Sequence, residues 1–94
     1  MFSWDETKRE KVISEHKIDF AKITDIFGDS FSIDFIDDEH SSEDEQRFAK
    51  IGITAEYGLI FLVYTSTDSE TVHFITARRA ESFMVKEYEK RKRY

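Results

Sequence analysis

The hydrophobic pattern of this chain changes its period near residue 30, and this change constrains the fold more than any other feature. Before it, apolar residues recur every three or four positions, as on one face of a helix: Phe20, Ile23 and Phe27. After it, apolar and polar residues alternate, as in a half-buried strand, with the apolar positions at Phe31, Ile33 and Phe35. A chain with both periods is expected to pack helices on a sheet, which is an α+β arrangement.

Local start and stop signals set the predicted boundaries. Ser3 and Glu6 match a capping box, which predicts a helix that starts near Asp5 and runs through His16. Asp19 is a typical N-cap for a second helix, which ends at Gly28. The remaining elements are predicted as strands at 31–35, 47–54, 59–65 and 71–77 and a helix from 78 to about 92. We therefore predict a single domain, residues 1–94, with two N-terminal helices, an antiparallel four-stranded sheet and a C-terminal helix.

Charge is divided unevenly along the chain. Residues 1–45 hold 14 acidic and 5 basic side chains (−9), and residues 46–94 hold 6 acidic and 9 basic ones (+3), which sum to the net −6. An acidic protein repels polyanions at long range, so a nucleic-acid site is expected to be local and to lie in the second half. The chain has no cysteine, which excludes disulfides and thiolate metal sites. No signal peptide precedes the first helix, and the longest apolar run, 59–64, is too short to span a bilayer, which predicts a cytoplasmic protein.

Two adjacent arginines are the most informative candidates for chemistry. Arg78 and Arg79 fall where the last predicted strand passes into the last predicted helix. A helix N-terminus carries partial positive charge, so two cations there are unfavourable unless an anion such as a phosphate binds them. The alternative is that both arginines pair with acidic neighbours such as Glu81, and position alone does not decide between the two.

Other polar residues are weaker candidates for the same site. Arg47 and Lys50 could join the anion site if their strand lies beside 71–77, although a surface charge is the commoner role for such residues. His73 could transfer protons near neutral pH, although most strand histidines are scaffold. His40 in the acidic loop suggests a metal only weakly, and no Walker loop, dinucleotide fingerprint, zinc pattern or nucleophile elbow occurs, so no metal or cofactor is predicted.

An ordered set of residues along the chain resembles the BrnT toxin family. Its members are Trp4-Asp5, Lys8, His16, Phe20-Ala21, Phe27, Asp29, His40, Glu45-x-Arg47, Gly52, Val63-Tyr64-Thr65 and Ile75-Thr76-Ala77-Arg78-Arg79-Ala80. The last stretch is the most specific, because it resembles the family's Ile-Ser-Ala-Arg-basic-Ala signature. The chain departs from the family at Val12, where Asn is usual, at Ser30, where Pro is usual, and at His73, where Arg is usual.

The resemblance implies a RelE-like fold and a ribonuclease toxin of a type II toxin–antitoxin pair that cleaves RNA without a metal. It also implies a partner antitoxin of the BrnA kind, which carries a ribbon-helix-helix region. The complex would bind operator DNA only through that antitoxin, as a heterotetramer of two toxins and two antitoxins. Residues 34–45 could dock basic antitoxin segments, could keep non-target RNA away by repulsion, or could be a solvated acidic loop.

We assign the expected catalytic roles by charge and proton chemistry. Arg78 and Arg79 are expected to stabilise the phosphorane, Arg47 to assist at the same site and His73 to move a proton, while Lys50 and Lys8 position neighbouring phosphates. A rival hypothesis is a non-catalytic module that kept the toxin fold and the antitoxin interface but lost nuclease activity. The acidic net charge and the replacement at His73 favour that rival.

Overall fold

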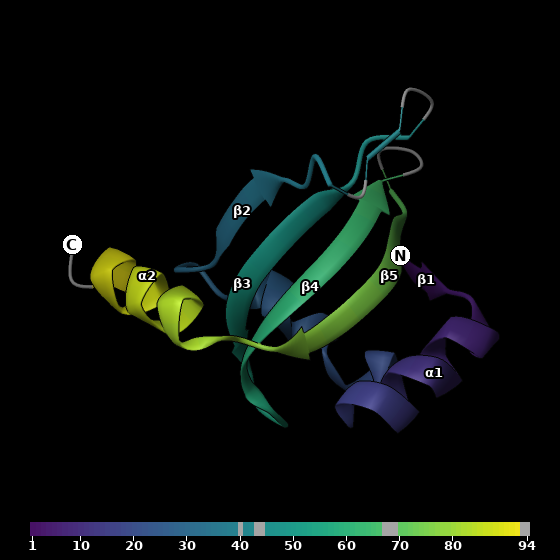
Figure 1. Ribbon diagram of the computed structural model, residues 1–94, viewed down its shortest axis with the longest axis horizontal. Coiled ribbons are helices and arrows are strands. Elements are labelled where there is room, and N and C mark those ends of the chain that lie inside the picture. Colours follow the sequence, from purple (N-terminus) through teal and green to yellow (C-terminus); the bar gives the residue numbers. More distant parts are fainter. Residues whose placement is uncertain (40, 43–44, 67–69, 93–94) are drawn as a thin grey trace.

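The computed structural model describes residues 1–39, 41–42, 45–66 and 70–92. The elements are, in order, β1 (Phe2–Trp4), α1 (Glu6–His16), the 3₁₀ helices η1 (Phe20–Lys22) and η2 (Thr24–Gly28), β2 (Ile33–Ile36), β3 (Phe48–Thr54), β4 (Gly58–Ser66), β5 (Val72–Arg79) and α2 (Ser82–Lys92). Figure 1 shows α2 at one end of a curved sheet and α1 at the other, with η1 and η2 behind the strands. The predicted α+β class is confirmed.

The sheet has five strands rather than the four predicted, in the order β1-β5-β4-β3-β2. The additional strand, β1, pairs in parallel with β5, while every other pair is antiparallel. Ser3 therefore lies in a strand and does not cap a helix. The cap of α1 is Asp5, whose Oδ1 accepts hydrogen bonds from the backbone N–H of Thr7 (2.8 Å) and Lys8 (3.4 Å).

The predicted second helix is replaced by two short 3₁₀ helices. Asp19 caps η1 as expected, because its Oδ1 accepts from Ala21 N at 2.9 Å. The helical path then breaks at Ile23, where φ is −124° and ψ is 9°. Residues three apart align along a 3₁₀ helix, so the buried side chains of this segment are Phe20, Ile23 and Ile26. Phe27, expected on the buried stripe, is only partly buried.

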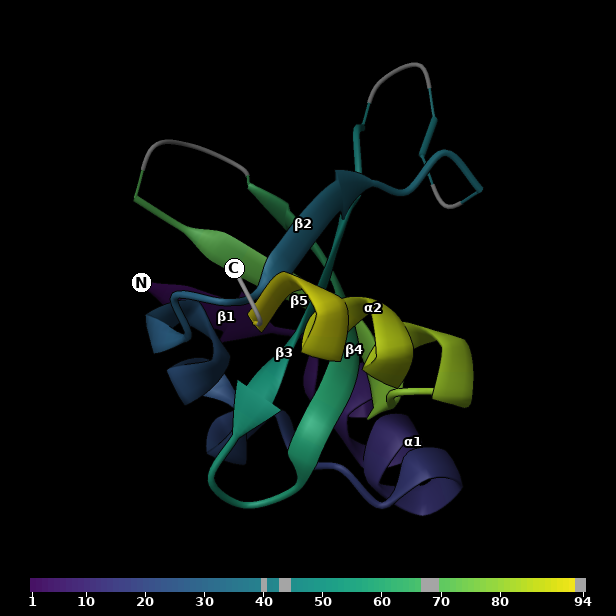
Figure 2. The same ribbon diagram turned by 90° about the vertical axis from the view of Figure 1, so that its left-hand side faces the viewer.

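Two apolar clusters hold the elements on the two faces of the sheet. The first joins α1 and the 3₁₀ helices to the sheet and contains Val12, Ile18, Phe20, Ile23, Ile26, Ile60, Leu62, Phe74 and Ala77. The second joins α2 to the sheet and contains Ala49, Ile51, Phe61, Val63, Ile75, Met84 and Tyr88. Figure 2 shows α2 and the 3₁₀ helices on different sides of the strands. We call the side covered in part by α2 the α2 face.

Two close contacts fix the layer behind the sheet. A Cβ on Gly52 of β3 would lie 2.6 Å from Cγ1 of Ile26, so only glycine allows η2 to approach β3 this closely. The Arg9 guanidinium of α1 forms two hydrogen bonds with the Asp19 carboxylate, at 2.8 and 2.9 Å, and thereby ties α1 to η1. These hydrogen bonds lower the pKa of Asp19 below its usual value. Within the described ranges, no helix has the length and apolar character needed to cross a bilayer.

Candidate RNA-binding site

The two signature arginines were expected at a helix N-terminus, but they lie at the end of a strand. Strand β5 continues through Arg78 and Arg79, which pair with Phe61 and Ile60 of β4, and α2 begins only at Ser82. Consecutive residues of a strand point to opposite faces. Arg78 accordingly lies over the Phe61 ring on the α2 face, with 5.0 Å between the guanidinium carbon and the ring centroid.

Arg79 points to the other side of β5. Its guanidinium carbon lies 5.6 Å from the centroid of the Tyr57 ring, and its Nη1 donates to the backbone oxygen of Tyr57 at 3.1 Å. Tyr57 packs against the cluster that contains α1 and the 3₁₀ helices. The two guanidinium groups therefore do not converge on one phosphate, and the expectation that they share an anion site is wrong for this conformation.

A row of polar residues crosses the α2 face at the opposite end of the strands. His73 of β5 pairs with Thr65 of β4 on one side and with Ser3 of β1 on the other. Thr65 in turn donates from Oγ1 to the backbone oxygen of Gln46, at 3.2 Å. Arg47 directly follows Gln46 and keeps the alternation of β3, so it falls on the same face as Ala49 and Thr65.

The sequence-based condition for a shared site, that the strand of Arg47 lie directly beside β5, is not met, because β4 lies between them; the register still places Arg47 and His73 in one row across the sheet. Their backbones are separated by two strand spacings of about 4.8 Å each. Side chains as long as those of Arg and His can both contact one nucleotide linkage across this separation. Arg78 lies on the same face, but it pairs with Phe61, four residues along β4 from Thr65. At about 3.3 Å per residue, that places it about 13 Å farther along the sheet.

Hydrogen bonds hold each of these side chains in place. Oγ of Ser3 lies 2.8 Å from Nδ1 of His73, which fixes the plane of the ring. Nε of Arg47 donates to the Glu45 carboxylate at 2.9 Å, and Nη1 of Arg78 is hydrogen-bonded to Glu81. All four charged side chains of these two pairs are partly exposed, so solvent and a bound polyanion can compete with the carboxylates.

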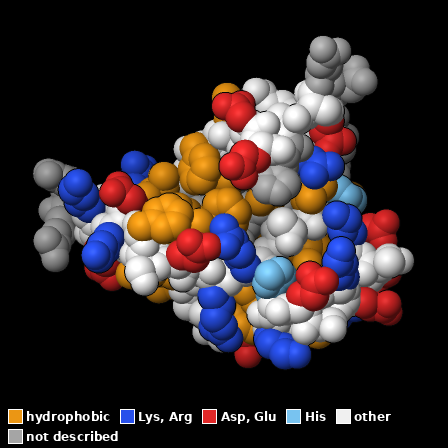
Figure 3. Space-filling model, viewed as in Figure 1, with side chains coloured by type: hydrophobic (Ala, Val, Ile, Leu, Met, Phe, Trp, Pro, Cys, Tyr) orange, Lys and Arg blue, Asp and Glu red, His pale blue; other side chains and the backbone are white. Residues whose placement is uncertain are grey.

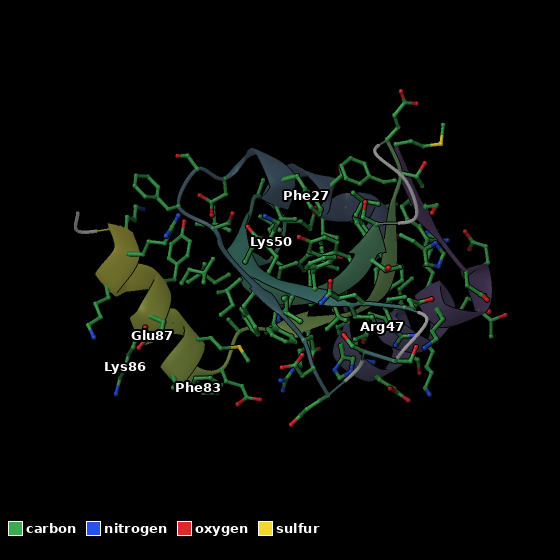
Figure 4. The ribbon with its side chains drawn as sticks, turned by 90° about the horizontal axis from the view of Figure 1, so that it is seen from above. Phe27, Arg47, Lys50, Phe83, Lys86 and Glu87 are labelled. Carbon is green, nitrogen blue, oxygen red and sulfur yellow. The ribbon has the colours of Figure 1, made fainter. Side chains whose placement is uncertain are left out.

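The two lysines expected to position phosphates lie elsewhere. Lys50 is 6% exposed, donates to Asp34 (2.9 Å) and Ser32 (3.2 Å), and lies over the Phe27 ring. In Figure 4, Lys50 and Phe27 lie together, away from Arg47 and from the labelled residues of α2. Lys50 therefore has a structural role in the interior of the protein. Lys8 is exposed in the first turn of α1, which packs against β5.

The sequence did not identify Ser3 or Thr65 as site residues, since Ser3 was assigned to a helix cap and Thr65 appeared only within the family resemblance. Strand β1 has only three residues, too few to show a period, so nothing marked Ser3 as a neighbour of His73. Among the described residues, no group of three or more His, Asp or Glu side chains is close enough to hold a metal ion. His40, which carried the weak metal hypothesis, lies outside the described residues.

Comparison with known proteins bears on the family and the fold of this chain. Residues 4–83 match the profile of the family described as ribonuclease toxin, BrnT, of type II toxin-antitoxin system. The fold is similar to the crystal structure of the Brucella abortus ribonuclease toxin BrnT, with a TM-score of 0.68 and 27% sequence identity over 87% of this chain and 99% of that one. A search of curated proteins found no match. Because the family profile covers most of its length, the chain belongs to the BrnT family of ribonuclease toxins of type II toxin–antitoxin systems.

Proposed function

We propose that this chain is an endoribonuclease that cleaves RNA with its own side chains, without a metal ion, on the α2 face of the sheet. The observation that carries the proposal is the placement of Arg47, His73 and Arg78 on one face of a protein whose net charge is −6. Local positive charge is what an otherwise repulsive surface needs to hold a sugar–phosphate backbone. BrnT membership supports ribonuclease chemistry in general.

The chemistry requires a proton acceptor and a group that stabilises developing negative charge. In the proposed reaction, the 2′-hydroxyl loses its proton to Nε2 of His73 while its oxygen attacks the adjacent phosphorus. The 5′-oxygen then leaves and takes a proton from water, and His73 returns its proton to the solvent, which gives a 2′,3′-cyclic phosphate and a 5′-hydroxyl. For Nε2 to accept, Nδ1 must carry the other proton and donate to Ser3, which the 2.8 Å contact allows.

Arg47 is the proposed partner of His73, because it lies in the same row across the sheet. Its guanidinium would stabilise the phosphorane, a form of electrostatic stabilisation that is usually the largest catalytic contribution. Arg78 would bind a neighbouring phosphate of the same RNA strand, farther along the α2 face from this row. Arg79 and Lys50 take no part in this scheme, since they face the other side of the sheet.

The proposed partner is an antitoxin of the BrnA kind, with a ribbon-helix-helix region, in a complex of two toxins and two antitoxins in the cytoplasm. Family membership implies an antitoxin, and the finer assignment rests on the sequence resemblance alone. In this scheme the chain contacts operator DNA only through the antitoxin.

The test is cleavage of RNA by the purified chain in the presence of a chelator. We expect fragments that end in cyclic phosphate, equal rates with and without EDTA, and a rate that falls sharply in Arg47→Ala. Expression of the chain alone should arrest growth, and co-expression of the short reading frame beside the gene should restore it. Cleavage that stops when EDTA is added would contradict the metal-free mechanism while leaving the ribonuclease assignment intact.

A second candidate is a non-catalytic antitoxin-binding module, and one observation favours it. Both guanidinium groups on the α2 face are paired with carboxylates, Arg47 with Glu45 and Arg78 with Glu81. This candidate predicts no growth arrest and no RNA cleavage at any protein concentration, together with a normal complex with the antitoxin.

A further inference from the structure

A groove of about 560 Å³ runs along the α2 face between α2, β2 and the residues that follow β2. Its apolar lining consists of Ile33, Phe35, Ile51, Phe61, Phe83 and Met84. Two of these rings are unusually accessible, since Phe35 is 43% and Phe83 60% exposed. Figure 3 shows apolar side chains gathered over this region, with acidic and basic side chains at the border. Exposed apolar surface of this kind marks an interaction site.

The border of the groove is strongly acidic. Four carboxylates line it, from Asp37, Asp38, Glu39 and Glu87, against the single guanidinium of Arg78. Asp38, Glu39 and Glu87 are exposed, and they come from both sides of the groove, the first two from the segment after β2 and the last from α2. This pattern repels a phosphate backbone, so the groove does not fit RNA.

We propose that this groove docks an amphipathic segment of the antitoxin, one that carries apolar anchors flanked by lysines or arginines. The inference rests on the proposed function for the existence of that partner and adds where it binds. The apolar lining would take the anchors, as grooves that bind amphipathic segments do. The carboxylates on either side would pair with the basic residues and fix the orientation.

The position of the groove explains how such a partner would neutralise the toxin. Arg78 belongs both to the groove border and to the face proposed to hold RNA. A segment seated over the Phe61 ring would cover the Arg78 guanidinium, which lies 5.0 Å from the ring centroid. Inhibition would then follow from occupation of the groove, with no change in the fold.

The apolar half of the proposal is tested by Phe83→Ala. Because Phe83 is 60% exposed, its removal should leave the fold intact, which circular dichroism can verify. We expect the purified product of the adjacent reading frame to bind the variant at least about tenfold more weakly, as for a central interface aromatic. RNA cleavage should stay at the wild-type rate. The matched control is Ile53→Ala, a 44% exposed side chain outside the groove lining, which should change neither property.

The charged half is tested by reversing two carboxylates that line the groove from different elements, the segment after β2 and α2. Asp38→Lys with Glu87→Lys should weaken binding of the same antitoxin, most strongly at low salt, because exposed charges are screened as salt rises. The control double variant, Glu10→Lys with Glu56→Lys, makes the same change in net charge at two exposed positions away from the groove. Wild-type affinity is expected for this control.

The outcomes separate this proposal from the one on which it rests. If the antitoxin binds the groove variants as tightly as the wild type, the docking surface is wrong while the toxin assignment stands. If it does not bind the wild-type chain at all, the assumed partner is wrong and the docking proposal falls, while RNA cleavage by the purified chain still decides the ribonuclease proposal. Loss of self-association in Phe83→Ala, with antitoxin binding unchanged, would assign the groove to a second copy of this chain and overturn the proposal. Weaker binding of a labelled single-stranded RNA by that variant alone would assign it to RNA instead.

Discussion

Arg78 and Arg79 are neighbours in sequence, yet their guanidinium groups lie on opposite faces of β5, one over Phe61 and the other over Tyr57. The strand pairing enforces this separation, because Ile60 and Phe61 of β4 hold both residues in the ladder. A phosphate on the α2 face can reach Arg78 but not Arg79. Of these two signature residues, Arg78 therefore faces the proposed RNA site, and Arg79 contacts the turn between β3 and β4.

The separation predicts unequal effects of the two alanine substitutions on RNA cleavage. Arg78→Ala removes a phosphate ligand, so its rate should fall by about tenfold or more. Arg79→Ala removes a hydrogen bond to the Tyr57 backbone and a ring contact, so it should lower stability by about 1 kcal/mol and leave the rate of the folded protein unchanged. Rates from single-turnover assays and urea unfolding of both variants provide the check. Equal rates for the two variants would contradict the division of roles.

A second prediction concerns His73 as the proton acceptor. His73→Ala should lower cleavage by about 10²–10⁴-fold, the usual contribution of a positioned acid or base. His73→Gln, which keeps a polar side chain next to Ser3, should be equally slow because it cannot accept the proton. Ser3→Ala should lower the cleavage rate less than either substitution, since it only removes the contact that orients the His73 ring. Single-turnover cleavage rates of the wild type and of the three variants provide the check. A rate for His73→Gln close to that of the wild type would assign the proton to another group.

The sequence predicted the helix–sheet class and most strand positions, because the two periods in the pattern record which face each residue buries. It failed where pairing with a distant strand sets the boundary. Strand β1 exists because it pairs in parallel with β5, far along the chain, where Val72 N donates to Met1 O, and no local pattern encodes such a pairing. Strand β5 ends at Arg79 rather than at residue 77 because β4 pairs with its last two residues.

The same limit applied to the candidate site. Once Arg78 and Arg79 belong to a strand, alternation alone separates them, so the wrong boundary led directly to the wrong anion site. For Arg47 and His73 the sequence supplied only a condition, that their strands be neighbours, and the structure instead places them in one row with β4 between their strands. The pairing of Arg78 with Glu81, which had been left open, depends on side-chain conformation and was visible only in three dimensions.

A third prediction concerns the ion pair behind the sheet. Lys50 has 8% of its side chain exposed and Asp34 has 46%. Loss of the ion pair should therefore be more unfavourable for the buried Lys50 than for the exposed Asp34. Asp34→Ala leaves a buried ammonium without its carboxylate, a loss of about 3 kcal/mol in the free energy of unfolding. Lys50→Met keeps the side-chain volume over the Phe27 ring and leaves a carboxylate that water can reach, so it should lower the free energy of unfolding clearly less.

Urea unfolding at neutral pH measures both variants of this ion pair. The double variant Asp34→Ala with Lys50→Met should regain much of the stability that Asp34→Ala loses, because the uncompensated charge is gone. RNA cleavage by Lys50→Met should match the wild type, in keeping with its position away from the α2 face. A larger loss of stability in Lys50→Met than in Asp34→Ala would refute this account of the pair.

A fourth prediction follows from Asp29, whose carboxylate joins three elements. It accepts from Phe31 N at 3.0 Å, from Ile53 N of β3 at 2.9 Å and from the Tyr88 hydroxyl of α2 at 2.8 Å. Burial alone would raise the pKa of Asp29, but these hydrogen bonds to the ionised form outweigh it and hold the pKa below its usual value.

Because the folded pKa lies below that of an unfolded Asp, about 3.9, the ionised group stabilises the fold above that pH. The contribution is lost as the pH falls through the folded pKa. Asp29→Asn should therefore be less stable than the wild type near pH 7, and the difference should shrink on acidification below about pH 4. Urea midpoints across this range test the prediction, with the exposed Asp38→Asn as a control.

Tyr88→Phe separates the carboxylate's own effect from that of its partner. Burial, followed by the hydrogen bond to Asp29, raises the pKa of Tyr88 to about 12, so the phenol remains a donor at every pH where the protein is used. Its removal leaves Asp29 with the two backbone donors, so the pKa of Asp29 should rise toward its usual value and stability near pH 7 should fall by about 1–3 kcal/mol. Carbon-13 NMR titration of the Asp29 carboxyl measures the first effect and urea unfolding the second. If the Asp29 titration is the same in Tyr88→Phe and in the wild type, the hydroxyl does not stabilise the charge, and α2 is held to the sheet by its apolar contacts alone.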